Sequence, residues 1–108
     1  MESIYLEYEN EMDLYESYMP FFTKGGLFFR TDELYDMGVE LTLYVMLPDS
    51  LEYTSVRTQV SWVTPYGTQN GNDMGVGVSF VEDIENVNQQ IERVIARLLG
   101  SHTPTLSM

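Results

Sequence analysis

Carboxylates are the side chains of this chain with the widest chemical scope, because they serve in general acid–base catalysis and in metal binding. A group of them lies near the N-terminus: Glu7, Glu9, Glu11, Asp13 and Glu16. Neither a DxDxDG calcium loop nor an HExxH zinc motif is present. Since like charges cost less when exposed than when gathered and desolvated, we expect a solvated acidic face here. The sequence predicts no catalytic residue, no metal site and no cofactor.

An acid–base enzyme would require two of these carboxylates in a pocket with perturbed titration, and the sequence gives no positive sign of such a pair. His102 is the only histidine, and no serine, carboxylate or second histidine surrounds it in a recognisable motif. The GVGV segment at 75–78 lacks the GxxxxGK[ST] ending of a phosphate loop and runs into a predicted strand. We therefore predict that the protein is not an enzyme and that these glycines are structural.

The charge balance restricts the partners of the chain. Its 108 residues carry 5 Lys and Arg against 17 Asp and Glu, a formal net charge of −12. Such a chain repels phosphate backbones and anionic lipids, and it contains no apolar run long enough for a membrane span. We expect no nucleic-acid partner and no direct membrane insertion. The N-terminal segment lacks the positive charge of a secretory signal, and the absence of cysteine fits a reducing compartment, so a cytoplasmic location is predicted.

Hydrophobic periodicity predicts a mainly β domain with two helices. The expected strands cover 3–8, 27–30, 39–47, 54–64 and 74–81, and the expected helices cover 11–19 and 83–99. This order favours a small antiparallel β-barrel with a short N-terminal helix and a C-terminal amphipathic helix. The length suits one domain, which we place at 1–100 with Gly100 as the helix stop. Residues 101–108 are expected to form an extended C-terminal tail.

The segment YMPFFTKGGLFF at 18–29 gathers five aromatic residues around two glycines. Gly25 and Gly26 adopt positive φ at little cost, which predicts a turn before the strand at 27–30. A buried hairpin accounts for part of this apolar surface. The remaining part indicates a partner, because large exposed aromatic side chains commonly anchor another protein.

Several segments, taken in their order along the chain, resemble the PilZ domain family and within it the stand-alone members that act in type IV pilus assembly. They are YMPFFTKGGLFF at 18–29, LTLYVMLPDS at 41–50, QVSWVTPYGTQ at 59–69, MGVGVSF at 74–80, IERVIARLLG at 91–100 and TPTLSM at 103–108. Each segment is weak alone, whereas the combination covers most of the chain and is specific. The resemblance implies a PilZ-type β-barrel.

Nucleotide-binding PilZ domains are recognised by RxxxR near the N-terminus followed by [DN]xSxxG, and they bind cyclic di-GMP. The paired guanidinium groups grip phosphates and stack on guanine. In this chain no arginine precedes Arg30, and alignment of the motif glycine to Gly26 puts Phe21 in place of Asp or Asn and Thr23 in place of Ser. The resemblance therefore implies a subtype that does not bind cyclic di-GMP by itself, since repulsion from carboxylates replaces charge-assisted bonding.

For stand-alone members the resemblance implies a role in type IV pilus biogenesis and twitching motility through binding of other proteins. The implied partners are the pilus assembly ATPase and a FimX-like EAL-domain protein that senses cyclic di-GMP. The candidate interaction residues are Tyr18, Pro20, Phe21, Phe22, Trp62, Pro65 and Tyr66. For each aromatic residue the alternative is full burial inside the barrel.

The sequence leaves a second function open, a direct cyclic di-GMP receptor that uses unconventional cations such as Lys24, Arg30 and Arg57. Two departures from the family pattern also bear on the partner. The N-terminal region is more acidic and richer in tyrosine than the pattern, and the tail reads TPTLSM where a PTHTM-like ending is usual. The tail, extended by Pro104, is a candidate recognition segment in its own right.

Overall fold

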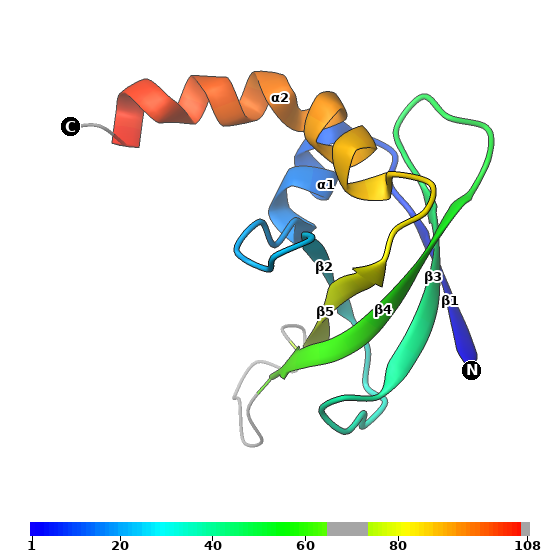
Figure 1. Ribbon diagram of the computed structural model, residues 1–108. Coiled ribbons are helices and arrows are strands. Elements are labelled where there is room, and N and C mark those ends of the chain that lie inside the picture. The colour runs from blue at the N-terminus through cyan, green and yellow to red at the C-terminus, as the bar shows by residue number, and fades with distance from the viewer. Residues whose placement is uncertain (65–73, 107–108) are drawn as a thin grey trace.

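The computed structural model describes residues 1–64 and 74–106. Five strands and two helices make up this part of the chain (Figure 1). In chain order they are β1 (Glu2–Glu7), α1 (Glu11–Ser17), β2 (Gly26–Arg30), β3 (Glu40–Met46), β4 (Thr54–Val63), β5 (Gly75–Glu82) and α2 (Val87–Leu106). All seven elements were expected from the periodicity, with shifts at their ends.

The strands form one curved sheet in the order β1-β3-β4-β5-β2, which makes a half-barrel with β1 and β2 at its edges (Figure 1). The predicted mainly β fold with a short N-terminal and a C-terminal helix is confirmed. Three of the four strand pairs are antiparallel, as expected, but β1 pairs with β3 in parallel. The long connection through α1 and β2 makes this possible, because parallel neighbours need a crossover of a dozen residues or more.

Aliphatic side chains from the concave face of the sheet form the core together with one face of α2. The alternation predicted for β3 is confirmed, since Leu41, Leu43 and Val45 are fully buried. Full burial of one such side chain contributes about 2 kcal/mol. The other fully buried aliphatic residues include Leu14, Leu27, Val60, Val76, Val78, Val87, Ile91 and Ile95.

A side-chain cap marks the start of helix α1, and pairing with β2 marks its end. The Asn10 side chain accepts a hydrogen bond from the Asp13 amide at 2.9 Å and caps the N-terminus, as the preference of asparagine for this position favours. The helix was expected to continue to Met19 and stop at Pro20, but it ends at Ser17. Tyr18 is extended and forms an antiparallel bridge with Leu27, so pairing with β2 ends the helix before the proline does.

Helix α2 starts later and ends later than predicted. Asp83 was expected to be its first residue; instead its carboxylate accepts hydrogen bonds from the amides of Val87 and Asn88, at 2.7 and 2.9 Å, and the helix begins at Val87. Ile84, assigned to the apolar face of the helix, is therefore 80% exposed. The expected stop at Gly100 and the extended conformation from residue 101 are wrong, since α2 runs to Leu106. A glycine within a helix costs about 1 kcal/mol without ending it.

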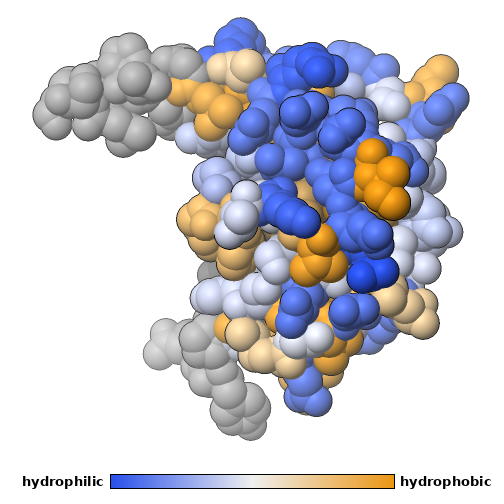
Figure 2. Space-filling model, in the orientation of Figure 1, coloured by the Kyte–Doolittle hydropathy of each residue, from blue (hydrophilic) through white to orange (hydrophobic). Residues whose placement is uncertain are grey.

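The surface is mostly hydrophilic on the face shown in Figure 2, and hydrophobic side chains appear there as separate patches. Within the described ranges, neither helix combines the length and the apolar character needed to cross a bilayer.

Candidate functional site

A strip of glycines forms the convex face of the sheet where β2 meets β5. The pairing of Gly26 with Ser79 and of Phe28 with Gly77 places these residues on the face opposite the buried Val76 and Val78. A methyl group added at Gly26 would collide with the Val78 carbonyl oxygen and the Phe22 ring. These glycines therefore let other side chains lie directly on the backbone, as expected from the GVGV segment.

Aromatic side chains and a methionine cover this glycine strip. A methyl group added at Gly77 would lie 2.7 Å from the Met19 sulfur and 3.3 Å from Cβ of Trp62, so both side chains rest on Gly77. The Trp62 ring meets the Phe28 ring edge-on, with centroids 5.9 Å apart. We use the name aromatic patch for the exposed and half-buried residues that lie along the strip: Met19, Pro20, Phe21, Phe22, Phe28 and Trp62.

Exposure within the aromatic patch is high for side chains of this size. Phe21 is 72% exposed and Trp62 is 42% exposed. Phe21 packs mainly on its neighbour Phe22, with ring centroids 4.8 Å apart. Large side chains that are held in place by neighbours and still face solvent are typical of protein-docking sites.

A β-bulge explains why Trp62 faces solvent. The alternation in β4 placed Trp62 on the same side as the buried Val56 and Val60. In the structure the register shifts between Val60 and Trp62, so Val60 pairs with Val78 while Trp62 pairs with Gly77. The extra residue turns Trp62 to the convex face, as bulges commonly do near functional sites.

Tyr18 does not belong to the aromatic patch, which corrects the expectation that it stands exposed as an anchor. It is 9% exposed, and its hydroxyl oxygen lies 2.6 Å from Oε2 of Glu92 and 2.9 Å from Oδ1 of Asn88. Burial and the Glu92 carboxylate raise the pKa of Tyr18 above its usual value. Tyr18 thus joins the N-terminal segment to α2 and stabilises the base of the patch.

We expect Tyr18→Phe to lower the free energy of unfolding by about 1 to 2 kcal/mol at pH 7, because Glu92 and Asn88 lose their partner. The raised pKa means that the folded protein keeps a proton that the unfolded chain releases above pH 10 or so, so this contribution falls as pH rises. Urea unfolding at pH 7 and at pH 10.5 measures both effects, with Tyr5→Phe as control. A deficit that grows with pH would contradict the assignment.

The other predicted interaction residues fall into two groups. Pro20, Phe21 and Trp62 are exposed and Phe22 is half-buried, so these four lie on the patch. Pro65 and Tyr66 lie outside the described residues. Met19 and Phe28 were missed as site residues. The sequence did indicate that Phe28 faces away from the core, because it lies between the inward-facing Leu27 and Phe29 of the same strand.

The cations proposed for an unconventional nucleotide site do not converge. Arg57 is paired with Glu82 at 2.9 Å and lies 4.0 Å from Glu40, so its charge is neutralised within the fold. The Lys24 ammonium donates to the Val81 carbonyl at 3.2 Å. Arg30 is at the far end of β2 from Lys24, a strand length of about 13 Å. Arg30 pairs with Gly75 and Arg57 with Glu82, at opposite ends of β5, so these two arginines do not lie side by side.

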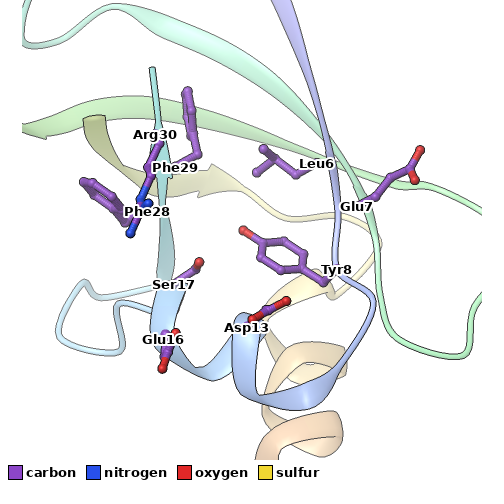
Figure 3. A pocket seen from close by; sticks show the side chains of 9 residues that line it. All are labelled: Leu6, Glu7, Tyr8, Asp13, Glu16, Ser17, Phe28, Phe29 and Arg30. Atoms are coloured by element: carbon purple, nitrogen blue, oxygen red, sulfur yellow. The ribbon is translucent and has the colours of Figure 1, made fainter. Parts of the chain in front are cut away.

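A groove of about 510 Å³ lies between β1, α1 and β2 (Figure 3). Leu6 and Tyr8 from β1 and the segment after it face Phe29 from β2 across the groove. Burial raises the pKa of Tyr8, so its hydroxyl stays protonated beside Ser17. Asp13, Glu16 and Arg30 complete the rim together with Glu7 and Phe28.

In the part of the chain that the structure describes, no group of histidine and carboxylate side chains is arranged to hold a metal ion. Two of the acidic residues near the N-terminus each have a hydrogen-bond partner of their own. The Glu11 carboxylate accepts a hydrogen bond from Arg97 of α2, and the Glu7 carboxylate accepts one from the Tyr53 hydroxyl. Glu7 is exposed and Glu11 is partly exposed, as expected for an acidic face in contact with solvent.

Residues 2–98 match the family model described as PilZ domain. Among curated proteins no match is found. PilZ domains are adaptors in cyclic di-GMP signalling and are generally non-catalytic binding domains. Given a match over nearly the whole chain and a half-barrel of the expected element order, the chain belongs to the PilZ domain family.

Proposed function

We propose that the chain is a non-catalytic cytoplasmic adaptor of type IV pilus biogenesis and twitching motility that works by binding other proteins. Its proposed partners are the pilus assembly ATPase and a FimX-like EAL-domain protein. The observation that carries the proposal is the aromatic patch on the glycine strip. This patch adjoins Gly26, the position that resembles the end of the nucleotide-binding motif, and it carries Phe21 where that motif has a polar residue.

The physical properties of the patch suit a protein rather than a nucleotide. Phe21 and Trp62 offer rigid rings that lose little conformational entropy on docking, and such rings dominate binding energy at protein interfaces. Cyclic di-GMP carries two phosphates, and a chain with a net charge of −12 repels it at long range. The resemblance to stand-alone members of the family supplies the pilus context.

The isolated chain is expected not to bind cyclic di-GMP. Of the cations considered for an unconventional site, Arg57 is already paired with carboxylates and Lys24 is bonded to a carbonyl. Isothermal titration calorimetry with the nucleotide at concentrations of about 100 μM should give no binding heat beyond dilution. Micromolar binding that disappears in Arg30→Ala would establish the alternative, a direct receptor.

A direct binding measurement tests the adaptor role. The purified chain is immobilised and exposed separately to the pilus assembly ATPase and to the EAL-domain protein of the same cell, with and without cyclic di-GMP. We expect saturable binding to at least one of them, and loss of surface pili when the gene is deleted. Absence of binding to both proteins, with normal piliation in the deletion strain, would refute the proposal.

A further inference from the structure

Three tyrosines form a platform on the convex face of the sheet. The platform lies at the β1 edge, whereas the aromatic patch lies toward the β2 edge. Tyr5 of β1 stacks on Tyr44 of β3, with ring centroids 4.8 Å apart and an interplanar angle of 13°. Tyr53 meets Tyr5 edge-on at 5.3 Å. Tyr5 is nevertheless 62% exposed. We call these three residues the tyrosine platform, which the adaptor role proposed above does not use.

Strand β1 beside the platform has a free edge. It is the first strand in the sheet order, and the Tyr8 amide donates to the Met46 carbonyl at 3.0 Å. In a parallel ladder alternate residues face the neighbour, so the N–H and C=O groups of Ser3, Tyr5 and Glu7 point away from β3. Within the described ranges these backbone groups have no strand partner. Such an edge is a template for an added strand.

The groove between β1 and β2 lies directly beside this free edge. Leu6 and Tyr8 point into the groove, whereas Glu7 points away from it (Figure 3). Ile4, Leu6 and Tyr8 are only half-buried, although they occupy the inward side of the strand. An added strand would therefore place alternate side chains on the tyrosine platform and in the groove, where Leu6, Tyr8 and Phe29 offer apolar surface inside a polar rim.

The charge around the tyrosine platform indicates which outward side chains an added strand would carry. The Glu7 carboxylate lies on the same face of β1 as Tyr5 and accepts a hydrogen bond from the Tyr53 hydroxyl, a neutral partner that leaves its charge intact. The nearest cation on this face of β4, Arg57, is committed to Glu82. Tyrosine rings beside a carboxylate favour guanidinium and ammonium groups, through cation–π contacts and ion pairing.

We propose that the free edge of β1 binds an extended segment of another protein in which apolar residues alternate with arginine or lysine. The apolar side chains enter the groove between Leu6 and Phe29, and the cationic side chains lie on Tyr5 and beside Glu7. A second copy of this chain fits poorly, because its own β1 carries Glu2 and Glu7 and no arginine or lysine to place beside Glu7. The occupant is therefore a basic strand of a different protein.

The test uses a fluorescein-labelled peptide RVRVRVR and its acidic counterpart EVEVEVE, titrated with the full chain at low salt and followed by fluorescence anisotropy. We expect the basic peptide alone to bind, and to shift the backbone amide NMR signals of Ser3, Tyr5 and Glu7. Tyr5→Ala and Glu7→Gln should each weaken binding about fivefold. Tyr5→Phe, which keeps the ring, and Phe21→Ala, which alters the aromatic patch, should not.

Four results would overturn the inference. They are absence of binding at millimolar peptide, equal binding of the two peptides, unchanged affinity in both Tyr5→Ala and Glu7→Gln, or amide shifts confined to the aromatic patch. Circular dichroism of each variant confirms that the fold is kept. Since the pilus ATPase and the EAL-domain protein are absent from this assay, its outcome is independent of the proposed function.

Discussion

Trp62→Ala is expected to weaken binding of the pilus assembly ATPase or the EAL-domain partner by about 2 kcal/mol or more, which is a loss of about 30-fold in affinity. Trp62 is 42% exposed and is held against Phe28 at the centre of the aromatic patch, so a partner gains a large ring at little cost in entropy. Surface plasmon resonance with the immobilised variant measures the loss.

Matched variants separate docking from folding. Leu51→Ala removes an aliphatic side chain that is 94% exposed in the turn between β3 and β4, and binding should not change. Phe21→Ala should weaken binding in the same direction as Trp62→Ala, because Phe21 is the most exposed ring of the patch. If Trp62→Ala and Phe21→Ala both bind the partner with the affinity of the unaltered chain, the aromatic patch is not the docking site.

Gly26→Ala is expected to lower the free energy of unfolding by about 3 kcal/mol. The added methyl group would collide with the carbonyl oxygen of Val78, which belongs to the backbone of β5 and cannot rotate away. It would also displace the Phe22 ring, which lies over Gly26. Relief of the clash requires β2 and β5 to separate, and the bond from the Met19 amide to the Gly26 carbonyl would weaken with it.

Urea unfolding of Gly26→Ala followed by tryptophan fluorescence measures this loss. Thr23→Ala serves as control, because Thr23 is exposed in the same turn and its substitution should change the stability by less than about 0.5 kcal/mol. A Gly26→Ala variant as stable as the unaltered chain would show that the glycine strip tolerates side chains and that the patch does not depend on close backbone approach.

Much of the fold was predictable because alternation and capping act locally. The inward residues of β3 and the cap at Asn10 follow from the identity of near neighbours. The parallel pairing of β1 with β3 was not predictable, because the alternation of one strand does not specify its neighbour or its direction. The late start of α2 was missed since Asp83 suits a cap as well as a first turn, and only the hydrogen bonds distinguish them.

The candidate site was predicted in part, and the errors have identifiable causes. Trp62 was a candidate interaction residue with burial as the alternative, since alternation along β4 puts it on the side of Val60; the bulge explains its exposure. Tyr18 was assigned to the surface because its partners Asn88 and Glu92 are some 70 residues away in sequence. Phe21 is exposed, as a docking residue must be, but its role as an interaction residue stays a prediction.

The pairing of its arginines suggests how the proposed adaptor would respond to cyclic di-GMP. A PilZ domain that binds cyclic di-GMP needs cations that are available to bind phosphates. In this chain Arg57 and Arg97 form ion pairs with carboxylates within the fold. The apolar residues along the glycine strip remain available. The proposed adaptor would thus respond to cyclic di-GMP only through a partner that binds the nucleotide.

Hydrogen–deuterium exchange of the chain alone and in complex with the pilus assembly ATPase, or with the EAL-domain protein, tests the central proposal most directly. We expect slower exchange on complex formation in the segments 18–29 and 59–64, which carry the aromatic patch. A complex that forms while both segments exchange at unchanged rates would contradict it.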